Sequence, residues 1–346
     1  MFYHENNRGR EMKIKKKWYI IGGAALLLLL VVFGVVAAWY LGAFDPPLVR
    51  YAPAEADMIV YVNCRKIALH KVIGSLAENS EIKAALEKAR QKSEIPARDL
   101  LNSELCVFAN TGSSGDSARK GCLTVLCRFH KLTGGVPKEV LNTNFHKRLL
   151  DGDSESTTIG GKPARVARRG RGRAAVVALD HRLMQYSVVP DDRTDFRLLA
   201  KGKPTDLAEL VDTDAMFSAV IRVGAGNHKE INEFVLDHVG VELPEDLTLA
   251  TVGLRESGDD LVLEAVLKFK RPESAKTVEE ALKNELAEIA ENNQDPTVKK
   301  LLKDIKISRD GGKLAVTLAE SSDEIIRIVN SAAVVKYICA LAAAKQ

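Results

Sequence analysis

The longest apolar run of the chain covers residues 18–44, WYIIGGAALLLLLVVFGVVAAWYLGAF, and it contains no charged side chain. About 20 apolar residues are enough to cross a bilayer as a helix. Trp-Tyr pairs stand near both ends of the run, roughly 31 Å apart on a helix, where their amphipathic rings suit the two headgroup layers. The pattern therefore predicts one transmembrane signal-anchor helix over residues 18–44.

The charges on either side of this helix predict its orientation. Residues 1–17 form a basic tail that ends in KIKKK, Lys13 to Lys17, whereas the run is followed by Asp45. Positive residues stay on the cytoplasmic side, so we expect a cytoplasmic N-terminus and an extracytoplasmic C-terminal domain on the cytoplasmic (inner) membrane. The alternative is a signal peptide cleaved after VAA, before Trp39, but its apolar region would far exceed the usual ~7–15 residues.

Beyond the membrane segment, residues 45–57 carry three prolines and predict a stiff linker. The rest of the chain contains four pairs of similar segments in the same order: EADMIVYV and DTDAMFSAV, IPARDLL and LPEDLTL, LCRFHK and LKFKR, RRGRGRAAVVALD and SRDGGKLAVTLAE. Such matches in register indicate an internal duplication. We expect a first repeat at residues 58–203 and a second at residues 204–346.

Both repeats show the same succession of hydrophobic patterns, which predicts a strand, a helix, a strand pair, a second helix and a closing hairpin. In the second repeat Pro272 opens a helix in which Val278, Leu282, Leu286 and Ile289 recur at helical spacing. The predicted fold class is α+β. A single N-terminal transmembrane helix precedes two tandem related halves, whose largely antiparallel sheets are covered by helices.

The strand pair ELCVFAN and GCLTVLCRF of the first repeat allows one apolar face to be assembled. That face requires Cys106 opposite Cys127 and Phe108 opposite Val125. The two cysteines are then either small buried hydrophobes or a cross-strand disulfide, which an oxidising compartment permits. Five cysteines without CxxC pairs indicate neither a disulfide scaffold nor a zinc site.

Charge removes one class of function. The chain has 50 Lys and Arg against 46 Asp and Glu, and its basic excess resides in residues 1–17, so the domain beyond the membrane is formally neutral. Nucleic-acid binding needs cations over a broad footprint, and we expect no nucleic-acid partner. One basic stretch stands out, with arginines at Arg165, Arg168, Arg169, Arg171 and Arg173. Its glycines match the DGG turn of the second repeat, which favours a hairpin turn; the alternative is a patch for an anionic lipid, polysaccharide or acidic partner.

Other motifs indicate little chemistry. RVGAGNHK, Arg222 to Lys229, lacks the complete spacing of a phosphate loop and predicts a tight strand-to-helix turn. The histidines are scattered, TGSSGDS is not a nucleophile elbow, and we expect no catalytic residue, metal or cofactor. The lipid bilayer is the expected partner of residues 18–44. Gly34, Ala38 and Gly42 form a small-residue stripe on this helix, which would also allow two copies to pack as a homodimer within the bilayer.

Two functions remain. The first is a cell-envelope protein whose duplicated, non-catalytic domain binds an envelope protein, an anionic polymer or itself. The second is a membrane-anchored, hydrolase-like ectoenzyme whose catalytic groups meet only in the fold, because triads are recognised by geometry rather than sequence order. A cleft with convergent polar and titratable groups would favour the enzyme, and a smooth or hydrophobic face would favour the binding domain.

Overall fold

The computed structural model describes residues 45–80, 102–111, 121–130, 136–142, 147, 150, 153–190, 195–203, 205–292 and 296–329. The chain divides into two compact units, Met1–Pro46 and Pro47–Gln346, and the elements named below belong to the second. The predicted membrane helix, with its Gly34, Ala38 and Gly42 stripe, lies outside the described residues. Within the described ranges no helix combines the length and apolarity that a membrane span requires.

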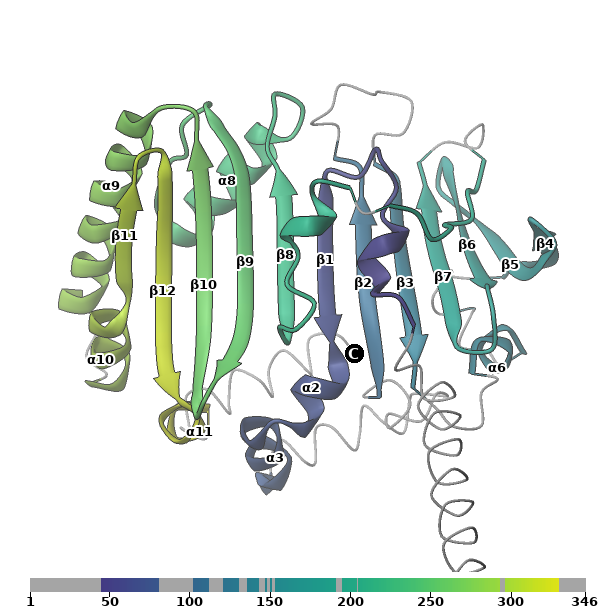
Figure 1. Ribbon diagram of the computed structural model, residues 1–346, viewed down its shortest axis with the longest axis horizontal. Coiled ribbons are helices and arrows are strands. Elements are labelled where there is room, and N and C mark those ends of the chain that lie inside the picture. Colours follow the sequence, from purple (N-terminus) through teal and green to yellow (C-terminus); the bar gives the residue numbers. More distant parts are fainter. Residues whose placement is uncertain are drawn as a thin grey trace, which may run out of the picture. The chain divides into compact units, whose positions relative to one another are not determined.

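The described strands form one twelve-stranded sheet, in which every neighbouring pair is antiparallel (Figure 1). In chain order they are β1 (Met58–Asn63), β2 (Ser103–Ala109), β3 (Leu123–Phe129), β4 (Glu155–Ile159), β5 (Lys162–Arg169), β6 (Gly172–Ala178), β7 (Leu183–Val189), β8 (Phe217–Arg222), β9 (Leu247–Ser257), β10 (Asp260–Phe269), β11 (Lys306–Asp310) and β12 (Lys313–Ser321). The fold is therefore α+β, as predicted, but a single sheet replaces the separate sheets that we expected for the two halves.

The sheet is joined at its middle by β1 and β8, the first strands of the two predicted repeats, whose paired positions include Met58 with Ile221. From this pair, β1-β2-β3-β7-β6-β5-β4 extends to one side and β8-β9-β10-β12-β11 to the other. Counted outward from the middle, the fourth and fifth strands are β12 and β11 on one side and β7 and β6 on the other. The sequence match between residues 168–180 and 308–320 aligns β5 and β6 with β11 and β12, whereas these outer places of the strand order are taken by β7 and β6.

Helices pack on one face of the sheet, the helix face, which carries Val60, Val107 and Val125. They are α2 (Cys64–Leu69), α3 (Lys71–Glu78), α6 (Val136–Asn142), α8 (His228–Val239), α9 (Pro272–Asn292), α10 (Pro296–Asp304) and α11 (Ser322–Val329). Under the second half, α8 and α9 enclose a core around Leu247, Phe269 and Leu314. Figure 1 shows α8 behind the sheet. Pro272 begins α9 and Val278 is buried in it, which confirms that predicted helix.

The opposite face is covered over its first half by extended chain and two short 3-10 helices, η1 (Leu48–Tyr51) and η3 (Ala208–Leu210). This linker face carries Ile59, Phe108 and Leu126 in one buried core with residues from both halves. Residues 195–199 are fixed by Gln185, whose side chain donates to the Arg197 carbonyl and accepts from the Leu199 amide. The predicted linker, 45–57, thus contributes to the core from Leu48 onward.

The register of β2 and β3 differs by one residue from the expected one. Cys106 pairs with Leu126 and Cys127 pairs with Leu105, so the two cysteines point to opposite faces, and both are free thiols. Of the two alternatives for this pair, the cross-strand disulfide is therefore wrong, and both cysteines are small buried side chains. A shift by one residue reverses every side chain of a strand. β2 is apolar on both faces, with Leu105 and Val107 on one and Cys106 and Phe108 on the other, so its pattern fits either register.

Candidate functional site

The arginine stretch is a hairpin, with β5 and β6 joined by a turn at Gly170, whose φ is +61°. This confirms the turn. The structure divides the side chains: Arg165 and Arg169 share the helix face with Ala167, whereas Arg168 and Arg173 are direct partners on the linker face. Arg173 lies 5.1 Å from the ring centre of Phe196. The five arginines therefore do not form one patch.

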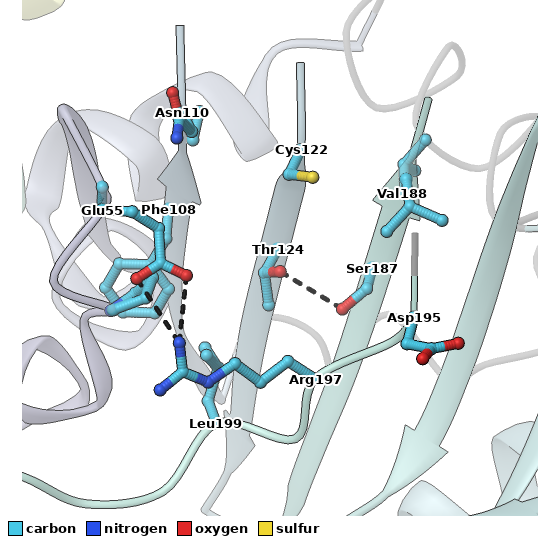
Figure 2. A pocket seen from close by; sticks show the side chains of 14 residues that line it. Glu55, Phe108, Asn110, Cys122, Thr124, Ser187, Val188, Asp195, Arg197 and Leu199 are labelled. Atoms are coloured by element: carbon cyan, nitrogen blue, oxygen red, sulfur yellow. Dashed lines mark hydrogen bonds and ion pairs between the residues drawn. The ribbon is translucent and has the colours of Figure 1, made fainter. Parts of the chain in front are cut away.

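A hollow on the linker face holds several polar groups (Figure 2). Arg197 points toward Glu55, with 3.1 Å between Nη1 and Oε1, and the hydroxyls of Thr124 and Ser187 are 3.2 Å apart. The cavity measures about 40 Å³. Because a single water occupies about 30 Å³ of liquid, this space suits a solvent molecule rather than a substrate.

A second polar cluster, centred on Glu104, lies on the linker face at the ends of β1, β2 and β3. Arg128 and His130 approach the Glu104 carboxylate at 3.4 and 3.5 Å. Burial raises the pKa of Glu104, but His130 and then Arg128 outweigh it and hold the pKa below its ordinary value. Burial, followed by the nearby Glu104 charge, raises the pKa of Tyr61. These groups satisfy one another in the interior, which is typical of a structural network.

An apolar hollow formed by described residues lies on the helix face, where α8 crosses the central strands. Its floor is formed by Met58 of β1 and Ile221 of β8, which are direct partners, and its wall by Ile231 and Phe234 of α8. The cavity measures about 370 Å³. This volume is within the ~300–1,000 Å³ of ligand pockets, which are mostly apolar and often lie between structural units.

The turn RVGAGNHK positions this hollow. Asn227 accepts from the Gly224 amide at 2.9 Å and donates to the Arg222 carbonyl at 2.9 Å, which closes the turn between β8 and α8. The tight strand-to-helix turn is thereby confirmed. Asn227 also donates to the Thr111 hydroxyl at 2.6 Å, and both side chains line the cavity. The turn thus fixes α8 against the end of β2.

Phe234 stands at the cavity with 62% of its surface exposed. Its ring stacks on His238 of the next helical turn, with 4.3 Å between ring centres. Leu236 and Val239 of the same helix are also exposed. Of these three side chains, Phe234 alone lines the cavity, and an exposed ring beside an apolar cavity marks a binding surface. The sequence motifs did not reveal this site. The available signal was the number of apolar residues in α8, which exceeds what one buried helix face can hold and leaves Phe234, Leu236 and Val239 exposed.

No protein-family model matches the chain, and no curated protein is similar to it in sequence. Among solved structures, crystal forms I, III and IV of TP0453 are similar to it, with TM-scores of 0.43, 0.42 and 0.41 and identities of 12%, 12% and 14%. The matches cover 82%, 82% and 84% of this chain and 96%, 97% and 100% of those chains. At these TM-scores the likeness assigns no function.

Proposed function

We propose that the chain is a single-pass cell-envelope protein, anchored in the cytoplasmic membrane by residues 18–44, whose extracytoplasmic domain binds an apolar ligand without catalysis. The observation that carries this proposal is the 370 Å³ apolar cavity between α8 and the β1–β8 pair. The polar hollow of about 40 Å³ is too small for a substrate. The apolar lining of the cavity and the exposed Phe234 beside it support a binding domain rather than the ectoenzyme.

The proposal includes an ancestral duplication of the domain. In its support, β1-β2-β3 and β8-β9-β10 take the same order outward from the middle of the sheet, and each series is followed by a hairpin, β7–β6 or β12–β11. The additional β4 and β5 of the first half are then an elaboration at one edge. The cavity lies where the two halves meet, a place that neither half forms alone.

The binding proposal is tested with the full-length chain in lipid nanodiscs. A fluorescent naphthalene probe of apolar sites, titrated with empty nanodiscs subtracted, is expected to bind in a saturable manner. Phe234→Ser removes an exposed ring at the cavity and is expected to weaken binding about tenfold, since each buried aromatic contributes ~1.5–3 kcal/mol.

Leu69→Ser is the matched control, because Leu69 is 75% exposed and lies on α2 rather than at the cavity. Equal weakening by both substitutions, or no saturable binding by the unaltered chain, would refute the apolar binding site. The orientation is tested separately with a C-terminal tag in cells whose outer barrier is permeabilised. External protease is expected to remove the tag, and a protected tag would disprove the proposed topology.

A further inference from the structure

The apolar surface continues from the cavity across the helix face. Met58, Ala109, Leu123 and Val188 are successive cross-strand partners in β1, β2, β3 and β7. Met58, Leu123 and Val188 are half-buried, whereas Ala109 is buried between them. Neighbouring strands are ~4.8 Å apart, so this apolar floor extends roughly 14 Å sideways from the cavity. We call this row of four side chains the apolar track.

The track ends at a guanidinium group. Tyr186 is two positions before Val188 on the same face of β7, and its hydroxyl accepts from Nη1 of Arg169 at 3.2 Å. Arg165 lies on this face too and donates from Nε to the Leu141 carbonyl at 3.2 Å. Both arginines thus donate to neutral oxygens, and within the described part of the chain neither forms an ion pair with a carboxylate.

The cavity is followed by the apolar track and then by a cation that no carboxylate of the described residues neutralises. This succession fits a ligand with a long apolar part and an anionic group at one end. A hydrocarbon chain would occupy the cavity and the track, while a single anionic group would neutralise Arg169. Guanidinium is well suited to this task, because its planar donors bind carboxylate or phosphate oxygens in pairs. A neutral apolar ligand would leave the charge of Arg169 unused.

On the basis of the apolar binding function proposed above, we infer that the ligand is a single-chain anionic amphiphile, with its chain along the Met58–Val188 track and its carboxylate or phosphate group at Arg169. The arginine hairpin then has two separate roles. Gly170 makes the turn, and Arg169, on the helix face, recognises the anion.

The inference is tested by equilibrium dialysis of the full-length chain in nanodiscs against three labelled twelve-carbon probes: dodecanoate, dodecyl phosphate and neutral dodecanol. Empty nanodiscs correct for partition into lipid. We expect both anionic probes to bind more tightly than dodecanol. Arg169→Gln should weaken both anions about tenfold, the scale of one charged hydrogen bond, and leave dodecanol unchanged. Arg169→Lys should restore part of the loss because it keeps the charge.

Arg171→Gln provides the matched control, since Arg171 is an exposed arginine of the same turn. Added salt should weaken anion binding, as screening of an exposed charge requires. The inference would be overturned, and the apolar site retained, if dodecanoate and dodecanol bound with equal affinity. In that case neither Arg169→Gln nor Arg171→Gln would change the affinity for the anionic probes. Failure of all three probes to bind would overturn the apolar site as well. Binding of inorganic phosphate as tightly as dodecyl phosphate would also overturn the inference, because the hydrocarbon chain of the probe would then contribute nothing to the affinity.

Discussion

Gly172 of the arginine hairpin has a different physical role from Gly170. Its backbone lies so close to the following strand that a Cβ would be 2.2 Å from the Val189 carbonyl oxygen and 2.9 Å from the Pro190 carbonyl carbon. These are backbone atoms, which cannot rotate away as a side chain can. The glycines of RGRGR thus include one that turns the chain and one that admits a neighbour.

Replacement of Gly172 by alanine should therefore destabilise the domain by about 1–3 kcal/mol, the usual cost of forcing extra volume into packed structure. Gly74 of α3 offers the contrast, because a Cβ added there would meet nothing within 4 Å. There alanine should stabilise by up to ~1 kcal/mol through helix propensity. Chemical denaturation of both variants measures the two changes, and loss of stability in Gly74→Ala alone would contradict the geometry.

Glu104 should make the stability of the domain depend on acidic pH. Its pKa is lowered in the folded state, so the unfolded chain binds a proton first, near pH ~4.3. The stabilising contribution is complete above that pH and is lost as the pH falls through the lower, folded pKa. Urea midpoints between pH 6 and 3, compared for the unaltered chain and Glu104→Gln, should show a flatter profile in the variant. Parallel profiles would exclude Glu104 as the cause.

Among the elements, the strand pair β2–β3 shows that a hydrophobic pattern can predict two strands without predicting the register in which they pair. The existence of both strands was predicted correctly from their apolar runs, as were the hairpin at Gly170, the helix from Pro272 and the turn before α8. The pairing register was not, because Phe108 on one face of β2 is as apolar as Val107 on the other. A strand buried on both faces carries no alternation that could choose between two registers.

The observed register predicts the behaviour of its thiols. Cys106 and Cys127 are buried on opposite faces, and burial raises the pKa of both, that of Cys127 to about 12. Since the thiolate is the reactive form, both should resist alkylation in the folded chain and react once it is unfolded without reductant. Cys122, which is half-buried, should react sooner. Mass mapping of the alkylated residues tests this, and a Cys106–Cys127 peptide linked by a disulfide would contradict the register.

At the scale of the molecule, long-range pairing determines what the sequence pattern does not. The cavity requires α8 to meet Met58 of β1, about 170 residues earlier in the chain. Local periodicity describes each element but not its neighbour, so neither the single sheet nor the cavity could be predicted. The predicted duplication indicated two halves, but their relation depends on the backbone pairing of β1 with β8.

The shared sheet predicts one cooperative unfolding transition for the domain. The linker-face core unites Leu48, Ile59 and Phe108 of the first part with Val211 and Val220 of the second. Because a half that unfolds alone would expose this core and the edge of a central strand, the two halves should lose structure together. Far-UV circular dichroism and hydrogen exchange of both halves should give coincident denaturation midpoints. Two separated transitions would indicate independent halves.

The β1–β8 pair also has a consequence for biosynthesis. Roughly 160 residues separate the two strands, and at ~5–20 residues per second a ribosome needs about 8–32 s to make them. During that interval β1 is complete, apolar and lacks the partner on its inner edge. An open edge strand pairs with whatever extended chain it meets. The nascent first half therefore has to be shielded, and holdase depletion should cause aggregation of the chain during its synthesis but not after it.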